Sequence, residues 1–130
     1  MVDTLMSIEE LNTRDKFKKA LRVLIEEIST CNKINQIIVF GSVAKGVATE
    51  NSDIDICILS DEDEFTLLTD STVNDSFLKL IRDGIDTHFD VLVYNSVSEL
   101  KIAFETTFMS VEKAIYEDGI TVFKRGAIAV

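Results

Sequence analysis

The sequence predicts a single α/β domain in which helices flank a mixed β-sheet of four to five strands. The chain has 130 residues, 46% of them hydrophobic and 28% charged, which is the composition of a globular protein long enough to bury a core. Segments with helical apolar spacing alternate with short continuous apolar runs. No internal repeat or Pro/Gly/Ser-rich linker divides them, so we expect one domain over residues 1–130.

The first half predicts one long helix and two strands. Apolar residues at helical spacing indicate an amphipathic helix over residues 13–30: Phe17, Leu21, Leu24, Ile25 and Ile28. The apolar runs "QIIVF" (36–40) and "IDICIL" (54–59) read as strands, and the first leads into a short helix at Gly41. Residues 60–75 form an acidic connection with room for one helical turn.

The second half alternates in the same way. Asp75 is the expected N-cap of a helix that ends near Gly84. "FDVLVY" (89–94) predicts a third strand, and "SVSE" (96–99) resembles a capping box that opens a helix through about residue 108. A helix over about 110–118 that stops at Gly119, and a closing strand over 120–124, complete the expected order.

The formal net charge of −10 disfavours some classes of partner. Such a surface repels nucleic-acid backbones and anionic lipids, and it suits a basic partner or metal ions that carry phosphates. A merely solvated acidic surface is the alternative. The start of the chain carries acids where a secretory signal has bases, and no apolar run approaches a membrane span. Cys31 and Cys57 lack metal-ligand spacing, so we expect packed thiols and a cytoplasmic location.

Two aspartates one residue apart are the main chemical feature of the sequence. Strand side chains alternate between faces, so Asp53 and Asp55 point the same way. Two carboxylates roughly 6 Å apart repel by about 2–3 kcal/mol at an effective dielectric constant near 20. Solvation, protonation of one carboxylate or a divalent cation would relieve this repulsion. Two unrelated acids on a solvated sheet edge are the alternative explanation.

A Gly-Ser pair precedes these aspartates. Gly41 and Ser42 end the first expected strand, where backbone N–H groups and a hydroxyl could hold phosphate oxygens. By itself Gly-Ser is a common turn dipeptide. Gly-Ser, ten intervening residues and "DID", flanked by apolar strands, together resemble the signature of the DNA polymerase β-like nucleotidyltransferase superfamily, over residues 36–59. The chain is similar to its smallest members, the minimal nucleotidyltransferases, which implies their single-domain fold.

The resemblance implies a third carboxylate on a neighbouring strand, and Asp90 in "HFDVLVY" supplies one. A strand-start cap is the alternative role for Asp90. If Gly41, Asp53 and Asp90 line one site, the first two strands run antiparallel and the second and third run parallel. The connection of about thirty residues is long enough for that crossover.

The resemblance also implies a mechanism, which is nucleotidyl transfer assisted by two Mg²⁺ ions, with ATP as the donor. Asp53, Asp55 and Asp90 would be the catalytic and metal-binding residues. Gly41 and Ser42 would hold the triphosphate. Lys45 stands where relatives often carry arginine, so it keeps a phosphate-directed charge without the bidentate fork.

Other residues have weaker claims to a function. His88, the only histidine, could lie near the metal site, although an exposed and incidental position is the simpler expectation. Lys124 and Arg125 could reach a phosphate or a partner, or form a solvated strand end. The acidic run at 61–64 is expected to be a solvated loop, with contact to a basic partner as the alternative.

Three functions remain open at this stage. Minimal nucleotidyltransferases are commonly paired with HEPN ribonuclease toxins, which implies an antitoxin that transfers AMP to a toxin tyrosine. A second hypothesis is an antitoxin that acts by stoichiometric binding alone. A third is an antibiotic-modifying nucleotidyltransferase, although such enzymes usually carry an extra helical domain. We expect ATP and a HEPN-type toxin as partners, and neither nucleic acid nor a membrane.

Overall fold

The computed structural model describes residues 5–106 and 111–126, with the side chains of residues 102–106 left out. Its helices are η1 (Ile8–Glu10), α1 (Asp15–Ile28), α2 (Gly41–Lys45), α3 (Glu64–Leu68), α4 (Ser71–Arg82), α5 (Val97–Thr106) and α6 (Val111–Asp118). Its strands are β1 (Ile34–Phe40), β2 (Ile54–Ser60), β3 (Phe89–Tyr94) and β4 (Ile120–Lys124). The expected order of elements is confirmed, and the expected helix boundaries at about 108 and 110 lie outside the described residues.

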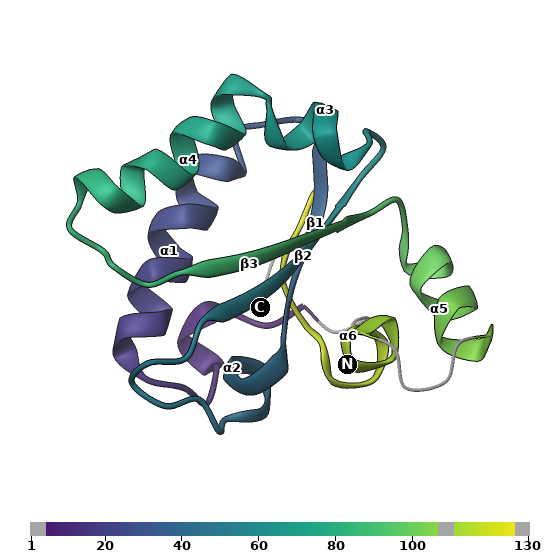
Figure 1. Ribbon diagram of the computed structural model, residues 1–130, viewed down its shortest axis with the longest axis horizontal. Helices are drawn as coiled ribbons and strands as arrows, with labels where there is room; N and C mark the ends of the chain where they lie inside the picture. Colours follow the sequence, from purple (N-terminus) through teal and green to yellow (C-terminus); the bar gives the residue numbers. More distant parts are fainter. Residues whose placement is uncertain (1–4, 107–110, 127–130) are drawn as a thin grey trace.

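The strands form one mixed sheet in the order β3-β2-β1-β4. Strand β1 pairs antiparallel with both β2 and β4, and β2 pairs parallel with β3. The two orientations expected from the positions of the aspartates are therefore confirmed. They bring the end of β1 and the starts of β2 and β3 to the same edge of the sheet (Figure 1).

Helices cover both faces of this sheet (Figure 1). Helices α1 and α4 lie on one face, where Ile54, Ile56 and Ile58 are fully buried. Helices α5 and α6 lie on the other, where Leu100 and Ile115 join a second core cluster with Cys57 and Leu59. Side chains along β2 alternate between the two faces of the sheet, so the side chain of Asp55 points to the α5/α6 face. It lies two residues before Cys57 and is not part of that cluster. The start of β2 is thus left partly open to solvent.

The expectation that Asp75 is the N-cap of helix α4 is wrong. Helix α4 begins at Ser71, and Asp70 is its N-cap, because the Asp70 carboxylate accepts hydrogen bonds from the backbone N–H groups of Thr72 and Val73. Asp75 lies inside the helix. The acidic run at 61–64 is also more than a solvated loop, since the Asp63 carboxylate accepts a hydrogen bond from the N–H of Thr66 and caps α3.

Arg125 has a structural role that the sequence did not reveal. Its guanidinium donates hydrogen bonds to the backbone carbonyls of Ser29, Cys31 and Ile34, at 2.7–3.0 Å. These bonds tie the end of β4 to the turn between α1 and β1. The idea that Arg125 forms a merely solvated strand end is therefore wrong.

The two cysteines are free and buried, as expected. Burial raises the pKa of Cys57 to about 12, so this thiol is inert packing rather than a nucleophile. Across the described residues, no helix has the length and apolar character needed to cross a lipid bilayer.

Candidate active site

Residue 41 of the Gly-Ser pair must be glycine, because the side chain of Asp55 approaches its backbone closely. Gly41 follows β1 with φ +72°, a conformation that L side chains rarely adopt. The carboxylate of Asp55 lies where a Cβ of residue 41 would stand. The Gly-Ser pair is thus packed directly against the second aspartate of the "DID" run, and any larger residue at 41 would displace that carboxylate.

Asp55 and Asp90 lie opposite each other on neighbouring strands. They are register partners in the parallel β2–β3 pair, so their side chains emerge on the same face. Partial burial, followed by the charges of Asp90 and Asp53 and a hydrogen bond with Asp90, raises the pKa of Asp55. The repulsion expected from the sequence is therefore present, and a divalent cation among these groups would relieve it.

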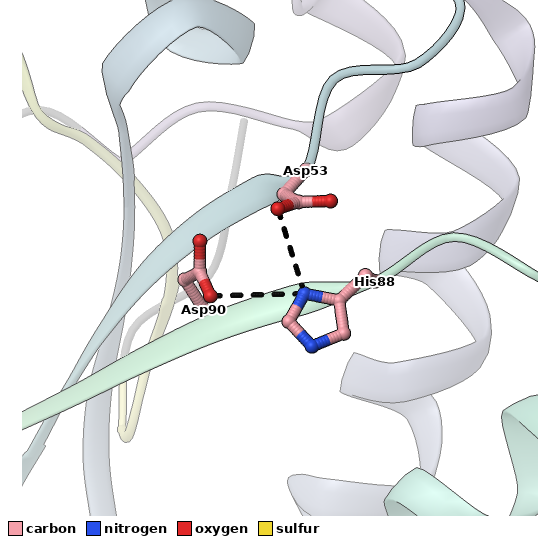
Figure 2. A group of neighbouring side chains, drawn as sticks. All are labelled: Asp53, His88 and Asp90. Carbon is pink, nitrogen blue, oxygen red and sulfur yellow. Dashed lines mark ion pairs between the residues drawn. The ribbon is translucent and has the colours of Figure 1, made fainter.

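Asp53, His88 and Asp90 form a second, more exposed group at the same edge (Figure 2). The Nδ1 atom of His88 lies 3.6 Å from Oδ2 of Asp53 and 3.7 Å from Oδ1 of Asp90. One ligand atom of each residue lies within 4.8 Å of the others. The side chains of Asp53, Asp90 and His88 are 49%, 57% and 68% exposed, so the group opens to solvent.

These donors fit a divalent metal ion. Carboxylate oxygens are the ligands that Mg²⁺ prefers, and they leave positions for substrate phosphates. The structure brings Asp53, Asp55 and Asp90 together from two strands, as expected. Their roles in catalysis and metal binding remain predictions.

The other predicted binding residues lie close by. Ser42 is in the first turn of α2, directly after Gly41. Lys45 is in the last turn, and its ammonium group lies 3.7 Å from a carboxylate oxygen of Asp118 on α6. Both side chains are about half exposed, so this ion pair is weak. Its phosphate-binding role is untested.

The sequence matches the model of the nucleotidyltransferase domain family over residues 21–119, which is most of the chain. The chain belongs to this family. Nucleotidyltransferases generally act on nucleoside triphosphates with divalent metal ions, and the matched region contains Gly41, Ser42 and all three aspartates of the candidate site. No protein of curated function matches the sequence significantly.

Several solved structures resemble this nucleotidyltransferase domain. A mutant of the MntA–HpeT toxin–antitoxin has a TM-score of 0.47 and 17% identity, over 83% of this chain and 73% of its own. A toxin–antitoxin structure with AMP-PNP has a TM-score of 0.43 and 19% identity, over 86% and 73%. A Sulfolobus solfataricus protein assigned as a nucleotidyltransferase has a TM-score of 0.47 and 18% identity, over 90% and 94%. These values concern the fold alone.

His88 is the residue of this nucleotidyltransferase that sequence reasoning undervalued. Its exposure was expected, but its position between two carboxylates was not. The available signal was its spacing, because a residue two before Asp90 in extended chain lies on the same face as Asp90. That spacing could not reveal how close Asp53 lies, since this depends on the register of β2 with β3.

Proposed function

We propose that this protein is an antitoxin of the minimal-nucleotidyltransferase type. In this proposal it transfers AMP from ATP, with Mg²⁺, to a tyrosine hydroxyl of a cognate HEPN ribonuclease toxin and so neutralises it. The observation that carries the transferase chemistry is the convergence of Asp53, Asp55 and Asp90 beside Gly41. The toxin partner rests on the resemblance to minimal nucleotidyltransferases.

Each site residue has a separate task in this proposal. Asp53, Asp55 and Asp90 would hold two Mg²⁺ ions, which when bound neutralise phosphate charge and lower the pKa of the acceptor hydroxyl. The backbone N–H groups after Gly41 and the hydroxyl of Ser42 would hold the triphosphate.

Lys45 would add a positive charge to the triphosphate site. To do so its ammonium group must leave Asp118, which the weak, half-exposed ion pair permits. The phosphate charge would then replace the Asp118 carboxylate as the partner of Lys45.

The transfer itself is a balanced displacement. The phenol oxygen of the acceptor forms a bond to the α-phosphorus, the bond from that phosphorus to the bridging oxygen breaks, and pyrophosphate leaves. The phenol proton passes to solvent. The residues of this chain contribute by aligning donor and acceptor, which accounts for much of the rate in reactions of this kind.

The surroundings of the site suit an acceptor on another protein. The exposed carboxylates of Asp53 and Asp90 leave the reacting edge open, so a tyrosine on a partner surface could reach it. The net charge of −10 favours a basic partner over a nucleic acid. Two free buried thiols support a cytoplasmic location.

The test is intact mass spectrometry of the protein and its cognate toxin after incubation with MgATP. We expect the toxin to gain about 329 Da for each adenylyl group, on a tyrosine, with loss of ribonuclease activity. The double variant Asp53→Asn, Asp55→Asn should bind the toxin but leave its mass and activity unchanged.

The control is Asp61→Asn, which removes an exposed charge just after the end of β2 that lies away from Asp53 and Asp55, and which should leave transfer intact. Full neutralisation by the Asp53→Asn, Asp55→Asn protein without any mass gain would instead support stoichiometric binding. Label from ATP on an antibiotic but never on the toxin would contradict the antitoxin proposal.

A further inference from the structure

The position of His88 relative to the two carboxylates is unlike a simple hydrogen-bonded pair. Its Nδ1 atom lies 3.6 Å and 3.7 Å from the nearest oxygens of Asp53 and Asp90, beyond the usual 2.7–3.2 Å of a hydrogen bond. Figure 2 shows the imidazole nitrogen and one oxygen of each aspartate facing a shared space. Donors that share one metal ion at 2.0–2.2 Å stand about 3 Å or slightly more apart, so small side-chain rotations would suffice.

The backbone holds His88 in this position. Its carbonyl accepts a hydrogen bond of 2.9 Å from the N–H of Ile54, which continues the β2–β3 pairing one residue before β3 begins. His88 is therefore part of the extended edge that carries Asp90, and its side chain emerges on the face of the carboxylates.

A nitrogen donor changes which ions the site prefers. Oxygen-only sites suit Mg²⁺, whereas imidazole binds first-row transition metals well and contributes little to Mg²⁺ binding. Mn²⁺ accepts both kinds of ligand and is compatible with carboxylate sites that also receive phosphates. An imidazole beside two carboxylates should therefore raise the affinity of the site for Mn²⁺ more than its affinity for Mg²⁺.

We propose that His88 is a ligand, through Nδ1, of the divalent ion that Asp53 and Asp90 share, and that it strengthens the binding of Mn²⁺ at this position more than the binding of Mg²⁺. The inference rests on the metal site of the proposed function and adds a residue to it. Asp55 is outside this group, and its carboxylate lies against Gly41 instead.

The direct test uses the fact that His88 is the only histidine in the chain. Untagged protein is loaded with Mn²⁺ and studied by electron spin echo spectroscopy, once with ordinary and once with ¹⁵N-labelled histidine. We expect a nitrogen modulation that changes with the label and that can come from His88 alone. Its absence in a protein that binds Mn²⁺ would overturn the inference.

The second measurement is the affinity for Mn²⁺, and for Mg²⁺ by competition, in the protein and its variants. His88→Gln should weaken Mn²⁺ binding about tenfold or more and change Mg²⁺ binding by less than about twofold. The matched control Asp86→Asn removes an exposed neighbouring charge and should alter both affinities weakly and equally. Equal effects of His88→Gln on the two ions would contradict the proposed selectivity.

Asp53→Asn separates this inference from the proposed function. If this change abolishes Mn²⁺ binding while His88→Gln has no effect, the acidic metal site stands and the role of His88 is refuted. If Asp53→Asn leaves the binding of both ions unchanged, the metal-dependent transfer reaction is refuted as well.

Discussion

At the residue scale, both the backbone conformation of Gly41 and its contact with Asp55 require glycine. Its positive φ disfavours any side chain by about 1–2 kcal/mol, and a Cβ there would also displace the Asp55 carboxylate. We predict that Gly41→Ala lowers the transfer rate about 100-fold, because a shift of about 1 Å in a catalytic group has an effect of that size. Steady-state rates and urea unfolding would measure the two effects separately.

Gly84 offers a matched control for this change. Its φ of +75° is almost the same, and no atom lies within 4 Å of a Cβ added there. Gly84→Ala should therefore lose a similar amount of stability and keep its activity. If both variants lost activity equally, the contact with Asp55 would not be what makes Gly41 necessary.

At the scale of elements, Asp70 joins α4 to the turn before β1. One of its oxygens caps the helix, and the other accepts a hydrogen bond of 2.9 Å from the Lys33 ammonium group. The hydrogen bond from Lys33 is the main cause of the lowered pKa of Asp70, and the same pair raises the pKa of Lys33. A lowered pKa in the folded state means that the carboxylate stabilises the fold above its unfolded pKa of about 3.9.

We predict that Asp70→Asn lowers the melting temperature at pH 7, and that the difference from the unmodified protein disappears as the pH falls through the folded pKa of Asp70. Asparagine keeps most of the helix cap and loses only the ion pair, so Asp70→Ala should be less stable than Asp70→Asn. Thermal melts between pH 3 and 7 would measure this. A difference that persisted unchanged in acid would contradict the assignment.

Whether an aspartate in this region caps a helix could be read from the sequence, but which one could not. Asp75 and Asp70 both precede apolar residues at helical spacing. The additional partner of Asp70 is Lys33, 37 residues earlier in the chain, and it becomes a neighbour only when α4 packs beside α1. The local pattern contained no information on that contact.

At the scale of the whole molecule, Arg125 links the end of the last strand to the turn that follows the first helix. Its three hydrogen bonds to carbonyls of the α1–β1 turn span more than ninety positions in the chain. We predict that Arg125→Ala reduces the free energy of unfolding by about 1–3 kcal/mol, because several charge-assisted bonds are lost together. Urea unfolding of the purified protein would measure this value.

Two further variants make this prediction specific. Arg125→Lys should recover only part of the loss, since a single ammonium group cannot replace the guanidinium fork. Lys124→Ala changes the exposed neighbouring charge, which makes no hydrogen bond within the described residues, and should be nearly neutral. All three variants should retain activity when folded, because these residues lie at the far end of β1 from Gly41.

The sequence by itself determined the alternation of helices and strands, the family resemblance and the acidic residues of the candidate site. These follow from local periodicity and from the spacing of Gly41, Asp53 and Asp55, which neighbouring residues specify. Only the tertiary structure decided that His88 faces two carboxylates, that Asp70 rather than Asp75 caps α4, and that Arg125 holds a turn. The physical reason is that each of these residues has a partner far away in the chain, which is Asp53 for His88, Lys33 for Asp70 and the α1–β1 turn for Arg125. Those distances depend on strand register and helix packing.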